Sequence, residues 1–128
     1  MNKLLCSLLM FASASAALAQ ECKRRPEVIG ACYVIHGRAE FGNGTPSLRI
    51  WRAGTKHKYG VFPDDPTVAP QNLLDALHNF DYSVYGDYEV CPYTREKKGS
   101  MTMVCIESAK NLVVTEYGTA TPVGERSH

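Results

Sequence analysis

The sequence lacks the motifs by which many enzymes and metalloproteins are recognised. Its four histidines are isolated, and there is no H-x-H or C-x-x-C pair of the kind that holds zinc. There is no G-x-S-x-G nucleophile turn, and the glycine-rich stretch 42–45 lacks the lysine of a phosphate-binding loop. The residues therefore predict no metal site and no cofactor.

A strong charge of either sign is also missing. The chain has 14 Lys and Arg against 13 Asp and Glu. Because nucleic-acid-binding domains are usually strongly basic, this balance argues against a nucleic acid as partner. Long apolar runs are absent too: the longest, Leu4 to Leu18, has about 15 residues, short of the ~20 of a membrane-spanning helix.

Residues 1–19 have the three parts of a secretory signal peptide. Lys3 supplies the positive charge, the apolar run follows, and Ala17-Leu18-Ala19 forms the cleavage site. Cleavage there removes Lys3 and Cys6, which leaves 13 basic against 13 acidic residues and an even number of cysteines. An even cysteine count is typical of disulfide-bonded proteins in oxidising compartments. We therefore expect a secreted or periplasmic protein with no membrane span after cleavage.

The remaining cysteines are Cys22, Cys32, Cys91 and Cys105, and four cysteines allow three connectivities. Spacing favours a Cys91–Cys105 disulfide, which would close a hairpin loop of about 15 residues. Such a bond would stabilise the folded state by ~3 kcal/mol. Cys22–Cys32 would then tie the N-terminal segment to the first strand. Pro92 opposes this pairing if Cys91 and Cys105 form a non-hydrogen-bonded pair, because the next pair would need an N–H that proline lacks.

The chain after the leader is long enough for one domain. We expect a polar N-terminal arm at 20–29, a single β-rich domain at 30–117 and a flexible tail at 118–128. Alternation of apolar and polar residues predicts a half-buried strand up to Phe41, with Gly37 marking a bend or the close approach of another backbone. Further strands are predicted at 47–52, 55–62, 84–93, 100–108 and 112–115, the last fully buried.

One helix is predicted, at about 70–80. Pro70 suits the first helical position, and Leu73, Leu77 and Phe80 share one face. Short strands separated by turns, with a single helix, predict a mainly β fold. The expected architecture is a small barrel or sandwich of about five or six short strands, stabilised by disulfides.

A candidate ligand site follows from the first hairpin. Asn-Gly at 43–44 favours a two-residue turn, in which the numbers of paired residues sum to 87. Arg38 would then face Arg49, and His36 would face Trp51. Directly opposed like charges destabilise a sheet, so another group should compensate for the two arginines.

Two explanations for this compensation remain open. Either Glu40 or an acidic residue from 64–89 neutralises the pair, or the pair binds an anionic ligand. In the second case Arg38, Arg49 and His36 form an anion-binding patch, and Trp51 offers a stacking surface. The expected function is a non-catalytic binding or interaction module whose partner is a small anionic ligand or an envelope protein.

Two alternatives accompany this interpretation. The first is a small periplasmic hydrolase that uses His36 with Asp87 or Glu89, two carboxylates that share a predicted strand face. The second is a structural component of an envelope complex, which would present an exposed edge strand or apolar patch.

The chain also resembles a family of small exported bacterial proteins with no assigned function. Three stretches carry the resemblance: HGR at 36–38, NGTPS at 43–47 with RIW at 49–51 and GT at 54–55, and VCIESAKNL at 104–112. The resemblance covers about residues 32–114. It implies a leader and a β-rich domain, and it implies no catalytic or ligand-binding residue.

Overall fold

The computed structural model describes residues 21–62, 69–77 and 82–116. Within these ranges the chain is mainly β with one α-helix, as predicted, and it also has one short 3₁₀ helix. The predicted signal peptide and tail lie outside the described residues, and no described helix is long and apolar enough to cross a membrane. The elements are η1 (Cys22–Arg24), β1 (Tyr33–Phe41), β2 (Leu48–Arg52), β3 (Lys58–Val61), α1 (Gln71–Leu77), β4 (Tyr82–Pro92) and β5 (Thr102–Glu116).

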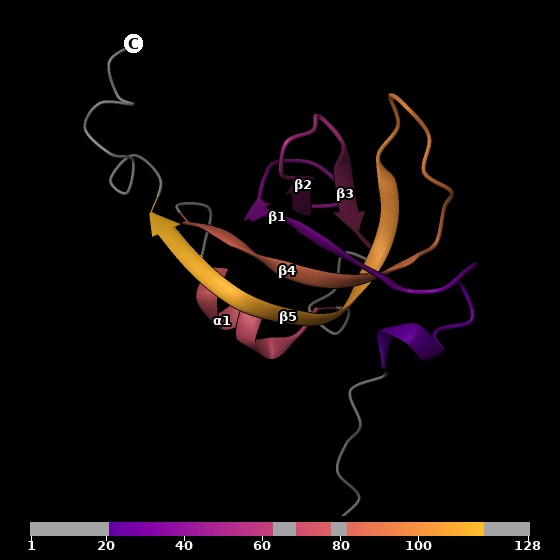
Figure 1. Cartoon of the computed structure of the whole chain (residues 1–128), viewed down its shortest axis with the longest axis horizontal. Coiled ribbons are helices and arrows are strands. Elements are labelled where there is room, and N and C mark those ends of the chain that lie inside the picture. The colour runs from indigo at the N-terminus through magenta and orange to yellow at the C-terminus, as the bar shows by residue number, and fades with distance from the viewer. Residues whose placement is uncertain (1–20, 63–68, 78–81, 117–128) are drawn as a thin grey trace, which may run out of the picture.

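The five strands close into a barrel in the order β1-β2-β3-β5-β4. All neighbours are antiparallel except β3 and β5, which are parallel. With α1 between β3 and β4 in the chain, this is the arrangement of an OB barrel, a small five-stranded Greek-key barrel. Helix α1 lies against β4 and β5, on the opposite side of the sheet from β2 and β3 (Figure 1).

The barrel interior is filled by the side chains that point inward from alternate positions of the strands. Ile35 and Ala39 of β1 face Ile50, Tyr59, Val84 and Tyr88, all of which are buried. Leu73 and Leu77 of α1 are fully buried, which confirms that the predicted helix packs through this face. Phe80, the third residue of that face, lies outside the described residues.

The predicted register of the first hairpin is wrong. Phe41 pairs with Leu48, so residues 42–47 form a six-residue loop and paired numbers sum to 89. Arg49 stabilises this longer loop, because its Nε donates to the Pro46 carbonyl at 3.0 Å and its Nη2 to the Asn43 carbonyl at 2.9 Å. Asn-Gly at 43–44 lies within the loop and does not form a two-residue turn.

The prediction of a separate, fully buried strand at 112–115 is also wrong. These residues are the last part of β5, which Figure 1 shows as one long curved strand. Val113 and Val114 are 59% and 46% exposed. An apolar run in a short strand suggested burial. However, this end of β5 pairs only with β4 among the described strands, because β3 closes the barrel at the other end of β5, at 102–104.

The favoured disulfide connectivity is wrong as well, although all four predicted cysteines form disulfides. The bonds are Cys22–Cys105 and Cys32–Cys91. Cys91 does lie opposite Cys105 on β5, but Cys32 continues the β1–β4 register, in which Tyr33 pairs with Val90. Closure of the barrel therefore brings Cys32 to Cys91, with their Cα atoms 4.2 Å apart.

Pro92 is accommodated without loss of a hydrogen bond. The N–H of Tyr93 donates to the Met103 carbonyl at 2.8 Å, so Tyr93 and Met103 are a hydrogen-bonded pair. Because the two pair types alternate along an antiparallel ladder, Pro92 and Val104 form a non-hydrogen-bonded pair. The Pro92 carbonyl accepts from Ile29, which attaches the N-terminal segment to the barrel.

Candidate functional site

The structure brings only part of the predicted patch together. On the outer face of the barrel, Arg38 of β1 pairs directly with Trp51 of β2, and its guanidinium lies 5.2 Å from the ring centroid. Arg49 pairs with Glu40, so the predicted opposition of two arginines does not occur. Since the Arg49 guanidinium holds the 42–47 loop, Arg49 does not join the patch.

Lys58 takes the place that was predicted for Arg49. It pairs with Trp51 from the other side, in β3, and its Nζ lies 5.1 Å from the ring centroid. We call Arg38, Trp51 and Lys58 the Trp51 platform. Cations near an aromatic ring are attracted by its electron-rich face, so the ring keeps two positive charges on one surface.

The two cations of the platform differ in their counter-ions. Arg38 Nε lies 3.4 Å from Glu40 Oε2, and Glu40 in turn accepts a hydrogen bond from Ser83 at 2.7 Å. Lys58 has no carboxylate within ion-pair distance in the described part of the chain. The positive charge that remains available to a ligand is therefore concentrated on the β3 side.

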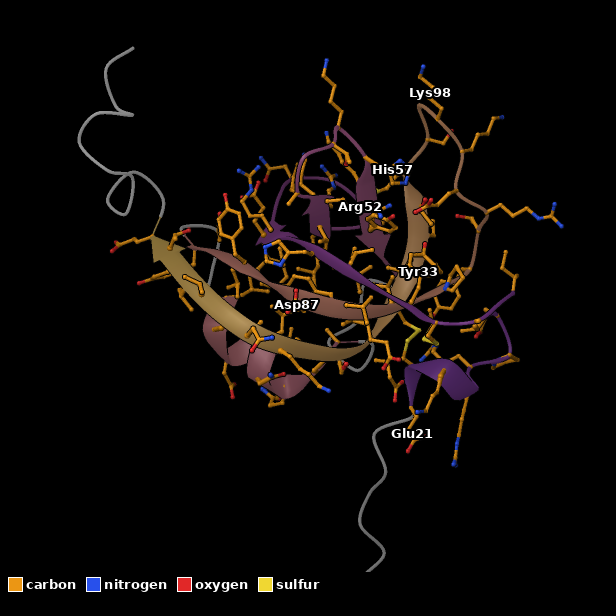
Figure 2. The ribbon with its side chains drawn as sticks, viewed as in Figure 1. Glu21, Tyr33, Arg52, His57, Asp87 and Lys98 are labelled. Atoms are coloured by element: carbon orange, nitrogen blue, oxygen red, sulfur yellow. A yellow bond between two sulfur atoms is a disulfide. The ribbon has the colours of Figure 1, made fainter. Side chains whose placement is uncertain are left out.

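A groove of about 680 Å³ continues the platform between the 53–57 and 93–101 loops. We call it the cationic groove; it is lined by Thr55, Lys56, His57, Lys58, Lys98 and Ser100, among others. None of its three lysines forms an ion pair with a described carboxylate, and no carboxylate lines it. Figure 2 shows His57 and Lys98 at the same end of the barrel.

His57 is held in the groove by hydrogen bonds and a ring contact. Its Nε2 lies 2.7 Å from the Oγ1 of Thr102, which is fully buried, and its ring packs edge-on against Tyr59. The backbone N–H of His57 donates to Thr55 Oγ1 at 3.0 Å. These contacts hold the 53–57 loop and thereby set the position of Lys56 and Lys58.

Glu96 closes the mouth of the barrel at this end. Its carboxylate accepts hydrogen bonds from Tyr59 and Tyr33 and lies 4.0 Å from the Arg52 guanidinium. The Tyr59 hydrogen bond is the main cause that lowers the pKa of Glu96, whereas burial raises the pKa of Tyr59. Glu96 thus anchors the 93–101 loop, which carries Lys98, to the barrel.

His36 lies elsewhere on the outer face and pairs with β4, not with Trp51. Its Nδ1 lies 2.9 Å from Asp87 Oδ1, and Asn111 donates to the other carboxylate oxygen at 2.8 Å. These hydrogen bonds, the one from Asn111 first, lower the pKa of Asp87. Glu89 faces Val34 and Ser108 and does not share this contact.

No metal centre is evident among the described residues. Their one compact group of candidate ligand atoms is made by Cys22, Cys91 and Cys105. All three sulfurs are in disulfides and do not offer thiolates to a metal.

Sequence reasoning missed Lys56, Lys58, Lys98 and Glu96. The hairpin pattern locates one strand pair, whereas the groove depends on the approach of two loops about 40 residues apart in sequence. A usable signal for Glu96 was present, since it is the one acidic residue in the basic run 95–98. Comparisons of the chain with protein-family models, with curated proteins and with solved structures find no match.

Proposed function

We propose that the protein is an exported, non-catalytic binding module for an anionic ligand. The single observation that carries this proposal is a groove with three lysines that pair with no carboxylate of the described residues. Lys58 makes this groove continuous with the Trp51 platform. All three lysines are exposed, so water solvates them and their ammonium groups remain available to pair with an anionic ligand.

The geometry favours an acidic oligosaccharide as the ligand. Sugar rings present apolar C–H faces that pack on an aromatic ring, and their carboxylate or sulfate groups pair with lysine and arginine. OB barrels bind oligosaccharides and oligonucleotides across strands 2 and 3 and the adjoining loops, which is where the platform and groove lie. The fold alone assigns no ligand, and the balanced net charge argues against a nucleic acid.

Calorimetric titration tests this proposal. The purified, disulfide-bonded protein should bind oligogalacturonate and should bind its neutral methyl ester at least about tenfold more weakly, because each charge-assisted contact strengthens binding. Added salt should weaken binding, since exposed charges are screened. Equal affinity for the acid and the ester would refute the proposal, and tighter binding of a single-stranded oligonucleotide would assign a different ligand class.

Variants identify the binding surface. Lys58→Gln and the double variant Lys56→Gln/Lys98→Gln should each weaken oligogalacturonate binding by about tenfold. Arg24→Gln is the matched control, because Arg24 is a well-exposed cation of η1 that pairs with Glu21. An equal loss in the control would show that the binding is not localised to the groove.

A small hydrolase remains a second candidate, favoured by one observation. The His36–Asp87 hydrogen bond is the contact by which a carboxylate orients a general base. However, in the described residues no hydroxyl or thiol is hydrogen-bonded to His36, and neither His36 nor Asp87 lines the cationic groove. Hydrolysis of an ester or glycoside that is lost in His36→Gln would favour this candidate over the binding module.

A further inference from the structure

A second hollow, of about 480 Å³, lies at the mouth of the barrel where β4 enters the 93–101 loop. One wall is apolar and is formed by Ile29, Pro92 and the ring of Tyr33. The other wall is charged and is formed by Arg52, Arg95 and Glu96. Figure 2 shows Tyr33 and Arg52 at this end of the barrel. The volume lies in the range of small-molecule sites, about 300–1,000 Å³.

The charged wall has a net positive charge that is available to a ligand. The Glu96 carboxylate is already engaged by two tyrosine hydroxyls and by Arg52. Arg95 forms no hydrogen bond or ion pair with any other described residue. A hollow lined both by apolar residues and by a guanidinium that pairs with no described residue is suited to a ligand that combines an apolar body with an anionic end.

We propose that the barrel mouth binds a small carboxylate with an apolar or aromatic body. The carboxylate pairs with the Arg95 guanidinium, which offers a two-pronged donor, and with the free N–H groups of Arg52. The apolar body packs on Ile29 and Pro92 and against the Tyr33 ring. This site is separate from the proposed saccharide groove, because the two share no lining residue.

Such a carboxylate has two sources, a free organic acid or the C-terminus of a peptide. Both present the same chemistry to Arg95. They differ in the amide group that precedes the carboxylate in a peptide, so a matched pair of probes separates them.

Gly30 allows the hollow to be filled without disturbing the fold. A Cβ at Gly30 would have Pro92 Cγ as its nearest neighbour, 4.0 Å away, which is an ordinary contact. Gly30→Leu should therefore occupy the space of the ligand body. Gly42→Leu is the matched control, since a Cβ there meets only Arg49 Nη1, at 3.8 Å, at the start of the 42–47 loop.

The test is titration of the disulfide-bonded protein with 3-phenylpropionate, followed by NMR. We expect saturable shifts at Tyr33 and Arg95, and binding of 3-phenylpropionamide that is about tenfold weaker or absent. Arg95→Gln should weaken binding of 3-phenylpropionate by about tenfold. Gly30→Leu should abolish this binding, and Gly42→Leu should leave it unchanged. A peptide that ends in free phenylalanine, compared with its C-terminal amide, then shows whether peptides occupy the same site.

Three results would overturn the proposal: equal binding of acid and amide, retained binding in Gly30→Leu, or no shift at the mouth at saturating acid. Arg95→Gln changes an exposed side chain, so it keeps the test decisive even if Gly30→Leu fails to fold. Trp51→Ala should leave binding of the acid intact, and Gly30→Leu should leave saccharide binding intact. Failure of one site is therefore distinguishable from failure of the other.

Discussion

Glu96 shows how much of this molecule depends on single side chains that local patterns do not reveal. It lies in a polar loop, where a solvated carboxylate is the usual expectation. In the fold its carboxylate accepts hydrogen bonds from two tyrosine hydroxyls and lies near Arg52. These contacts attach the 93–101 loop to the barrel mouth. Arg49 and Lys58 show the same effect: the arginine predicted for the site supports a loop, and a lysine of the third strand contacts Trp51.

The pH dependence of stability tests the role of Glu96. Its pKa is lowered in the fold, mainly by the Tyr59 hydrogen bond, so it stabilises the protein above its unfolded pKa of about 4.3. That contribution is lost as the pH falls through the lower, folded pKa. We expect Glu96→Gln to be less stable than the wild type at pH 7, and the difference to shrink as the pH is lowered below 4.

Urea unfolding at a series of pH values measures this difference. Glu21→Gln is the control, because Glu21 pairs with Arg24, whose side chain is well exposed. A deficit in Glu96→Gln that is the same at every pH would contradict an ionised Glu96 as the anchor of the loop.

At the scale of elements, alternation and turn residues predicted the helix and the first four strands to within a few residues, but they divided β5 into two strands. These signals are local, since each depends on which side chains of one segment reach the core. Pairing is not local. The β1–β2 register depends on a guanidinium that holds the 42–47 loop, and the β1–β4 register joins segments about 50 residues apart. The register error put Arg49 and His36 into the predicted site, whereas Lys58 was missed because it lies on a third strand, β3.

Gly37 is the position where local prediction and long-range pairing agree. It pairs with Gly86 of β4 on one side and Arg52 of β2 on the other. A Cβ at Gly37 would lie 2.4 Å from the Trp51 carbonyl oxygen and 2.9 Å from Ile50 Cγ2. The predicted close approach of another backbone at Gly37 is therefore confirmed, and that backbone carries the platform tryptophan.

We expect Gly37→Ala to destabilise the protein by about 1–3 kcal/mol, because the backbone of β2 must shift to admit the methyl group. Gly42→Ala is the matched control and should change stability by less than about 0.5 kcal/mol, since its only close neighbour is the end of a flexible arginine. The free energy of unfolding in urea measures both. Equal stability of the two variants would show that β1 and β2 are farther apart than described.

At the scale of the whole molecule, the two disulfides connect segments that are distant in sequence. Cys32–Cys91 spans 59 residues and joins β1 to β4, and Cys22–Cys105 spans 83 residues and joins the N-terminal segment to β5. Spacing along the sequence favoured the local pairing, because Cys91 and Cys105 flank a predicted hairpin loop. It holds no information on which strands become neighbours when the barrel closes.

Tryptic mapping of the non-reduced protein tests this connectivity directly. Lys23 and Arg24 lie between Cys22 and Cys32, and three basic residues lie between Cys91 and Cys105, so trypsin separates all four cysteines. Mass spectrometry should find Cys22 linked to Cys105 and Cys32 linked to Cys91. Replacement of Cys32 and Cys91 together by alanine should cost about 4 kcal/mol of unfolding free energy. A peptide that links Cys91 to Cys105 would contradict this connectivity but not the barrel, because Cys91 and Cys105 are paired across β4 and β5.

The most direct test of the proposed function uses Trp51, the only tryptophan in the chain. Its intrinsic fluorescence reports the platform without a label. Titration with oligogalacturonate should change this fluorescence to a plateau, and Lys58→Gln or added salt should move the midpoint to about tenfold higher ligand concentration. Fluorescence that does not respond to the acidic saccharide, or that responds equally to its neutral ester, would contradict an anion-binding site at Arg38, Trp51 and Lys58.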